Sequence, residues 1–195
     1  MIGFLIVHLA GNLTLYADDT GEAFDAYEHT LTSNPLLPIA EIGLLALFAT
    51  HIGLALKLQM ENRLARNSRY VSRGDHGKKT PASSSMALTG LVTLVFIIIH
   101  LLDFRFAKEE GASMAALVKE TLSDPLHGGA YFAFVCVLTM HLAHGFKSAC
   151  QSLGLGHPRY SEAFERVSIG LAVLLGLGFA SFPLVMIFTG GGNAS

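Results

Sequence analysis

The sequence has little of the charge that soluble domains carry and almost no cysteine. Charged residues make up 14% of the 195 residues, tryptophan is absent and only two cysteines occur. Cys136 and Cys150 lie on one predicted helix, about 21 Å apart, which is too far for a disulfide. Two thiols are also fewer than the four that usually hold an iron–sulfur cluster. The net charge of −2 gives no indication of a nucleic-acid partner.

Long apolar runs are what the sequence does contain. Hydrophobic residues make up 51% of the chain, and the mean hydropathy is +0.49. The charges cluster between the runs, which is typical of a polytopic membrane protein. We therefore predict an all-α fold, a single transmembrane five-helix bundle over residues 1–195. The helices are expected at about 1–16, 36–59, 86–106, 126–151 and 163–188.

The first predicted helix is short for a membrane span, which needs about 20 residues. Residues 1–16 begin abruptly, without the basic lead-in or the cleavage site of a signal peptide. We expect a helix whose inner end is missing. Residues 17–35 are expected to form an acidic loop, and Met114 to Leu122 a short surface helix.

The basic residues predict the orientation. Residues 60–84 and the segment after the fourth helix carry most of the lysine and arginine, whereas residues 17–35 carry none. Positive charge stays on the cytoplasmic side of a membrane. The amino terminus is therefore predicted to be cytoplasmic, in a multi-pass protein of the cytoplasmic membrane.

Four of the predicted helices carry a histidine deep among apolar residues: His8, His51, His100 and His141. A polar group in hydrocarbon needs a partner. His8 and His100 lie about six to eight residues from the outer ends of outward-running helices. His51 and His141 lie about eight to ten residues from the inner ends of inward-running helices. The four histidines are therefore predicted to form an outer pair and an inner pair.

Two neutral imidazoles at one depth suit a six-coordinate b-type haem, because each Nε2 can fill an axial position. The two pairs therefore predict two haem b groups. A histidine inside a membrane can also be a packing residue or part of a proton relay, so a haem-free transporter is an alternative. His144, one turn after His141, is an alternative ligand.

The residues around these histidines resemble the cytochrome b membrane subunit of succinate dehydrogenase and fumarate reductase, in its single-subunit, five-helix, two-haem form. The resemblance is carried by FLIVHLAGNL, LFATHIGLALK, FIIIHLLDF and MHLAHGFKSACQSLGLGH. In that family the ligand lies four residues before the glycine of H-x-x-H-G-F, which implies His141 rather than His144. The resemblance implies that His8 and His100 bind the outer haem, and that His51 and His141 bind the inner one.

The resemblance also implies a function. The chain would be the haem-carrying membrane anchor of a succinate:quinone oxidoreductase. It would bind a flavoprotein subunit and an iron–sulfur subunit and exchange electrons with quinone, typically menaquinone. This chain alone would not carry the dicarboxylate chemistry, and we expect its cytoplasmic face, including Arg63–Lys79, to dock the partners. The alternative is the two-haem anchor of another quinone-linked enzyme, such as a hydrogenase or formate dehydrogenase.

Further site residues are suggested by position, and none of them is catalytic toward the dicarboxylate. Quinol oxidation needs a proton acceptor close to a haem edge. Glu28, with His29 as second choice, lies in the outer loop near the outer haem level. Lys147 at the inner end of the fourth helix and Arg105 at the outer end of the third are expected to contact haem propionates.

Overall fold

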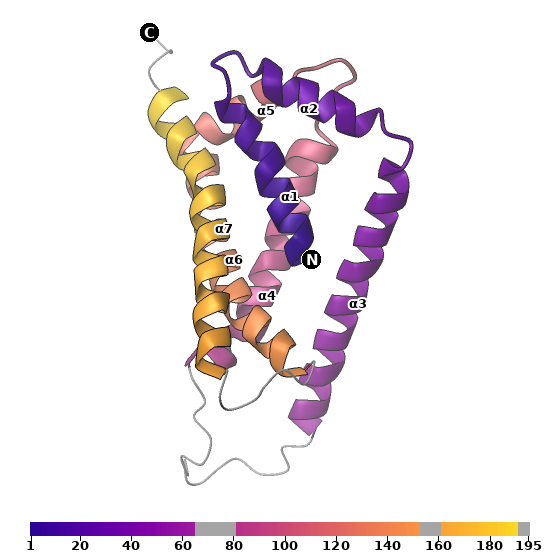
Figure 1. The fold of residues 1–195 in the computed structure, drawn as a ribbon, viewed down its shortest axis with the longest axis vertical. Coiled ribbons are helices and arrows are strands. Elements are labelled where there is room, and N and C mark those ends of the chain that lie inside the picture. Colours follow the sequence, from indigo (N-terminus) through magenta and orange to yellow (C-terminus); the bar gives the residue numbers. More distant parts are fainter. Residues whose placement is uncertain (65–80, 153–160, 191–195) are drawn as a thin grey trace.

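The computed structural model describes residues 1–64, 81–152 and 161–190 (Figure 1). The basic residues from Arg66 to Lys79 lie outside this part of the chain, as do the side chains of Arg63 and Lys147. The helices are α1 (Ile2–Leu13), α2 (Glu22–Thr32), α3 (Leu37–Leu64), α4 (Pro81–His100), α5 (Met114–Ser123), α6 (Pro125–Ser152) and α7 (Ser161–Gly190). A 3-10 turn, Thr14–Tyr16, extends α1, and a π-helical turn, Leu101–Arg105, extends α4.

Most of the described chain forms apolar helices of membrane-spanning length. Four stretches are long and apolar enough to cross a membrane: Leu37–Glu61, Ser85–Arg105, Pro125–Cys150 and Glu162–Gly190. A shorter apolar stretch covers Ile2–Tyr16. The predicted all-α bundle is therefore confirmed within the described residues. With the turns that extend α1 and α4 included, the largest differences from the predicted helix ends are five residues, at the end of α3 (Leu64, predicted 59) and at the start of α4 (Pro81, predicted 86), which is more than the one or two residues of usual scatter.

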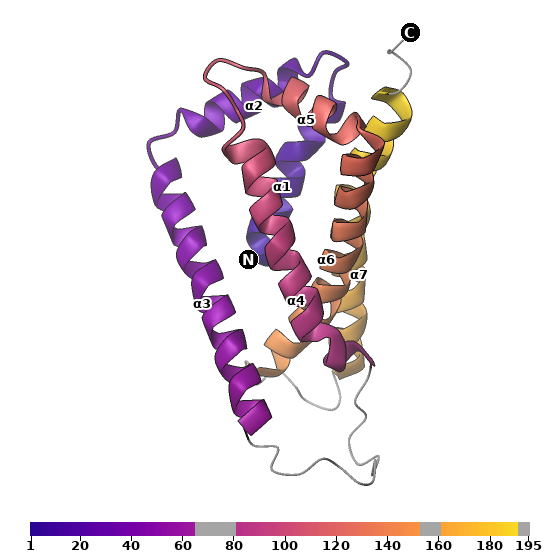
Figure 2. The same cartoon turned by 180° about the vertical axis from the view of Figure 1, so that it is seen from behind.

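Helices α4, α6 and α7 form the packed part of the bundle, with α6 between the other two. α1 lies against α7, and the amino terminus lies about midway along the bundle (Figure 1). α2 and α5 lie across one end, which we call the capped end (Figure 2). α3 stands apart from the packed helices in both views.

Small residues allow α7 to approach its neighbours closely. A Cβ at Gly176 would overlap the side chain of Thr139 on α6, and one at Gly178 would lie 2.6 Å from Leu9 on α1. Lipid supplies no hydrophobic driving force between spans, so close van der Waals contact is what holds them together. Gly170, by contrast, faces open space.

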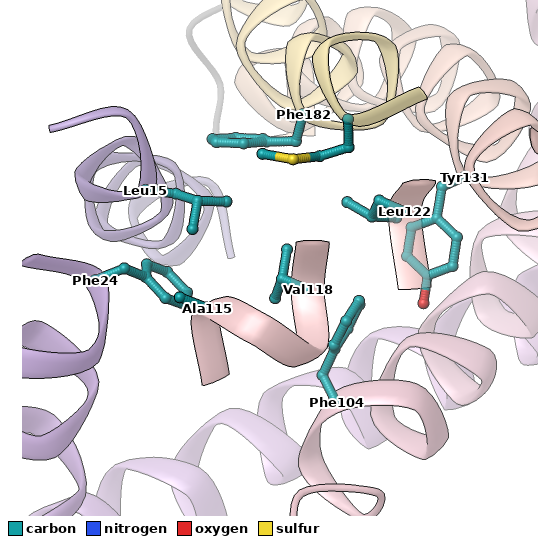
Figure 3. Close-up of a cluster of buried hydrophobic side chains, with 9 residues drawn as sticks. Leu15, Phe24, Phe104, Ala115, Val118, Leu122, Tyr131 and Phe182 are labelled. Atoms are coloured by element: carbon teal, nitrogen blue, oxygen red, sulfur yellow. The ribbon is translucent and has the colours of Figure 1, made fainter. Parts of the chain in front are cut away.

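The largest buried apolar cluster lies at the capped end. Ala115, Val118 and Leu122 share one face of α5, as their spacing of three and four residues requires. Figure 3 shows them facing side chains from the elements around α5. These side chains are Leu15, Phe24, Phe104, Tyr131, Phe182 and Met186. α5 thus connects the ends of α1, α2, α4, α6 and α7.

The predicted loop over residues 17–35 is wrong in its middle part, because α2 lies there. The Asp18 carboxylate accepts hydrogen bonds from the backbone N–H groups of Gly21, Glu22 and Ala23. It thereby satisfies donors that a helix start leaves free. The N–H of Ala23, followed by that of Gly21, holds the pKa of Asp18 below its ordinary value. Gly21 has a φ of +90°, which favours glycine at the turn into the helix.

The predicted surface helix near Met114 is confirmed as α5. Its N-terminus is capped by Ser113, whose Oγ accepts the N–H of Ala116 at 3.0 Å. The Asp25 carboxylate on α2 accepts the N–H of Ala115 at 2.8 Å. A negative charge is favourable at a helix N-terminus, and this contact fastens α2 to α5.

The close contact at Gly176 predicts different effects on stability for two glycine substitutions on α7. Gly176→Ala should lower the free energy of unfolding by about 1–3 kcal/mol, because the new methyl group overlaps Thr139. The thermal midpoint of the purified protein should fall accordingly. Gly170→Ala is the matched control, because its methyl group meets nothing. Thermal unfolding in one detergent measures both, and equal midpoints for the two variants would contradict the packing.

Candidate functional site

The cap-side pair consists of His8 on α1 and His100 at the end of α4. Their ring centroids lie 5.8 Å apart and their planes meet at 89°. Phe4 stacks on His8 at 5.3 Å, and Phe104 lies edge-on to His100 at 5.2 Å. The Nδ1 atom of His100 is buried and has no hydrogen-bond partner among the described residues. A buried nitrogen without a partner is costly, so this ring needs a partner beyond those residues.

The far pair consists of His51 on α3 and His141 on α6. Their ring centroids lie 6.3 Å apart and their planes meet at 83°. The hydroxyl of Thr89 donates to the Met86 carbonyl and lies 3.3 Å from Nδ1 of His141. While it donates to this carbonyl, the hydroxyl can accept a hydrogen bond from Nδ1–H of His141. In that tautomer the lone pair of Nε2 is free to bind a metal.

The two pairs lie at two levels of the bundle. On α4, Thr89 contacts His141 and precedes His100 by eleven residues (89 to 100), about 16 Å along the helix. On α6, the Tyr131 ring contacts His100 at 6.2 Å and precedes His141 by ten residues (131 to 141), about 15 Å. The structure therefore brings together the histidines that the sequence paired by depth.

α3 is positioned by few contacts. None of its membrane-spanning stretch is buried, and it shares no extended packing with another described element. Within the described part of the chain, the side-chain contacts that join it to the bundle include the ring contact of His51 with His141 and the ion pair of Glu41 with Arg105 at 3.0 Å. The imidazole of His51 is thus the polar group by which the middle of α3 meets the bundle.

The ring spacing of each pair would suit two imidazoles that bind one metal. Two imidazoles on opposite sides of a metal, with metal–nitrogen bonds of about 2 Å, have ring centroids about 6 Å apart. The observed distances are 5.8 and 6.3 Å. Among the described residues, no group of three or more His, Cys, Asp or Glu could hold a metal ion. Further ligands would have to come with the metal, as they do in a tetrapyrrole.

Two predicted site residues form ion pairs of their own. Arg105, predicted to contact a propionate, donates to Glu41 from Nε at 3.0 Å and from Nη2 at 3.4 Å. Glu28, predicted to accept a quinol proton, pairs with Lys108 at 2.7 Å, and both side chains are about four-fifths buried. His29 is exposed on α2.

Two other predictions concern α6. The ring that faces His51 is that of His141, and His144 lies one turn further along the helix. The side chain of Lys147, predicted to contact a propionate, lies outside the described part of the chain.

A hydrogen-bonded cluster beside the cap-side pair was not predicted from the sequence. The Tyr131 hydroxyl donates to Oδ2 of Asp103 at 2.6 Å, and Nε2 of His127 lies 3.0 Å from the same oxygen. The four-residue spacing of His127 and Tyr131 was a signal, because it places both on one face of α6. The position of Asp103, three residues after His100, was a second signal in the sequence.

The fold and the histidine pairs define a polytopic helical membrane protein with two candidate metal-ligand pairs. The family model described as "Succinate dehydrogenase/Fumarate reductase transmembrane subunit" matches residues 59–184. The chain belongs to this family, and it is therefore a multi-pass membrane subunit of an oxidoreductase complex. The match includes His100 and His141, whereas His8 and His51 precede it. Neither the curated proteins nor the solved structures contained a match.

The ion pair of Glu28 and Lys108 predicts that substitutions of these two residues have non-additive effects on stability. Glu28→Gln or Lys108→Met alone should each cost about 1–3 kcal/mol, because each leaves a partly buried charge without its partner. The double variant should recover much of that loss. Thermal midpoints of the four proteins measure the coupling, and strictly additive shifts would contradict it.

Proposed function

We propose that the chain is the haem-carrying membrane anchor of a succinate:quinone oxidoreductase and passes electrons between an iron–sulfur subunit and a quinone. The observation that carries the proposal is the meeting of imidazoles from different helices at two levels, at 5.8 and 6.3 Å. Family membership supports a flavoprotein and an iron–sulfur subunit as partners. It also favours this anchor over that of a hydrogenase or formate dehydrogenase.

In this proposal His8 and His100 hold an outer haem b, and His51 and His141 hold an inner one. A b-type haem with both axial positions filled exchanges single electrons and leaves no position for oxygen. Thr89 keeps His141 in the tautomer that offers Nε2, and it fixes the orientation of the ring.

The isolation of α3 supports a bulky group beside it. Its apolar side chains make no extended contact with another described helix, and none of its spanning stretch is buried. A macrocycle held between His51 and His141 would give α3 the packing partner that those helices do not provide. Gly90 on α4 leaves space for the His141 ring, because a Cβ there would come within 3.3 Å of that ring.

Several finer assignments stay predictions. The orientation predicted from the basic residues makes the capped end the outer end. The resemblance implies that the quinone is menaquinone. Glu28 and His29 are candidates for the proton acceptor, and Arg105 and Lys147 for propionate contacts. Glu28 and Arg105 would first have to leave Lys108 and Glu41. The dicarboxylate chemistry would belong to the flavoprotein subunit.

The ligand proposal predicts that variants fall into two groups. His8→Ala and His100→Ala should each remove the outer haem, and His51→Ala and His141→Ala the inner one, because a haem held by two imidazoles loses stability with either. Reduced-minus-oxidised spectra and redox titrations of the purified complex identify the haem that survives. The surviving potential should be the same within a group and different between groups.

His144→Ala is the matched control for these variants, and it should keep both haems. Loss of the same haem in the His8 and His51 variants would contradict the pairing. A wild-type complex without haem would overturn the proposed function.

The role of Thr89 predicts a change in one potential only. Thr89→Val removes the acceptor of Nδ1–H, which makes His141 a weaker electron donor. The inner haem potential should rise by on the order of tens of millivolts, with the outer potential unchanged. Thr93→Val is the control, because its hydroxyl donates to the Thr89 carbonyl one turn away. A similar rise in the control would contradict the role.

A further inference from the structure

The carboxylate of Asp103 is held in a fixed orientation beside the cap-side pair. Asp103 lies in the π-helical turn, three residues after His100. Its Oδ2 accepts a hydrogen bond from the Tyr131 hydroxyl at 2.6 Å and lies 3.0 Å from Nε2 of His127. Tyr131 and His127 share one face of α6, because they are four residues apart. The two contacts therefore fasten the carboxylate to a second helix and keep its place relative to the pair.

The charge of this carboxylate has no permanent counter-charge close to it. Within the described residues, no lysine or arginine forms an ion pair with Asp103. The basic residues that follow it along the chain, Arg105 and Lys108, pair with carboxylates on α3 and α2 instead. His127 carries a charge only when it is protonated, and a neutral imidazole can donate to a carboxylate without cancelling its charge. The turn after α4 therefore brings a negative charge next to the cap-side pair.

The side chains that separate Asp103 from the pair exclude water. Tyr131 is 5% exposed, and its ring centroid lies 6.2 Å from that of His100. Phe104 is 9% exposed and lies 5.2 Å from the same ring. Electrostatic interactions are stronger where water is excluded, because the local dielectric constant is low. The carboxylate is close enough for its charge to act on the His100 imidazole.

Asp103 also borders an open hollow that contains two other carboxylates, those of Glu120 and Asp124. Glu120 is exposed on α5, so water and salt screen its charge. The Asp103 side chain is only 21% exposed. Of these two charges, that of Asp103 therefore acts more strongly on the pair.

We infer that the Asp103 carboxylate is a fixed negative charge that lowers the reduction potential of the outer haem, and that Tyr131 and His127 position it. The inference rests on the proposed function. A ferric haem carries one more positive charge than a ferrous haem, so a nearby negative charge stabilises the ferric form. Thr89 acts on the inner haem through a ligand, whereas Asp103 acts on the outer haem through space.

Redox titration of the purified three-subunit complex at one pH tests the inference. Asp103→Asn removes the charge and nearly keeps the shape of the side chain. At a fixed applied potential, the ratio of reduced to oxidised outer haem should rise about tenfold, which corresponds to about 59 mV for one electron. A unit charge at roughly 10 Å, in a medium of effective dielectric constant about 20, has an effect of that order. The inner haem potential and the content of both haems should equal those of the wild type.

Two variants are matched controls for Asp103→Asn. Asp103→Glu keeps the charge and should keep an outer potential close to that of the wild type. Glu120→Gln removes an equal charge from the same hollow. It should change the ratio of reduced to oxidised outer haem by less than about twofold, because the exposed carboxylate is screened.

His127→Lys keeps the inference testable if Asp103→Asn assembles poorly. Its ammonium group places a positive charge beside the carboxylate and should raise the outer potential, as Asp103→Asn does. An unchanged outer potential in both variants would overturn the inference. A rise in Asp103→Glu or Glu120→Gln equal to that in Asp103→Asn would overturn it as well. A haem-free wild-type complex would instead overturn the proposed function.

Discussion

Four imidazoles inside apolar helices must each meet a partner, and the bundle depends on this constraint. Lipid cannot satisfy a ring nitrogen, and the backbone groups of the same helix are already hydrogen-bonded to one another. His8 and His51 therefore turn toward His100 and His141 on other helices. The effect is clearest for α3, whose spanning stretch is not buried by any other part of the described chain. The ring contact of His51 with His141 and the ion pair of Glu41 with Arg105 hold this helix beside the bundle.

The capped end holds the largest buried apolar cluster of the described chain, and this cluster fastens the helix ends together. Hydrophobic burial stabilises at the aqueous boundary, and α5 buries Ala115, Val118 and Leu122 there against the ends of its neighbours. The Asp25 carboxylate adds a charged link between α2 and α5. The cap-side pair and the Asp103 cluster therefore lie where helix ends are held most firmly, whereas the far pair lies among helices that touch less.

The histidine pairs could be predicted because depth along a span follows from residue count alone. α2 could not, because its start depends on how the Asp18 carboxylate folds back onto three backbone N–H groups. The Asp103 cluster was hidden for a related reason, since the π-helical turn changes which side chains share a face after His100. The ion pairs of Glu28 and Arg105 join helices far apart in sequence, so only the fold reveals them.

Electron paramagnetic resonance of the oxidised wild-type complex tests the central claim most directly. Ring planes at 89° and 83° would make the two imidazoles of each bound haem nearly perpendicular, which would give the ferric haem a strongly anisotropic low-spin signal. The proposal predicts two such signals, which integrate to two haems per chain of this subunit. A spectrum with no low-spin haem, or with a high-spin haem that lacks an axial ligand, would contradict it.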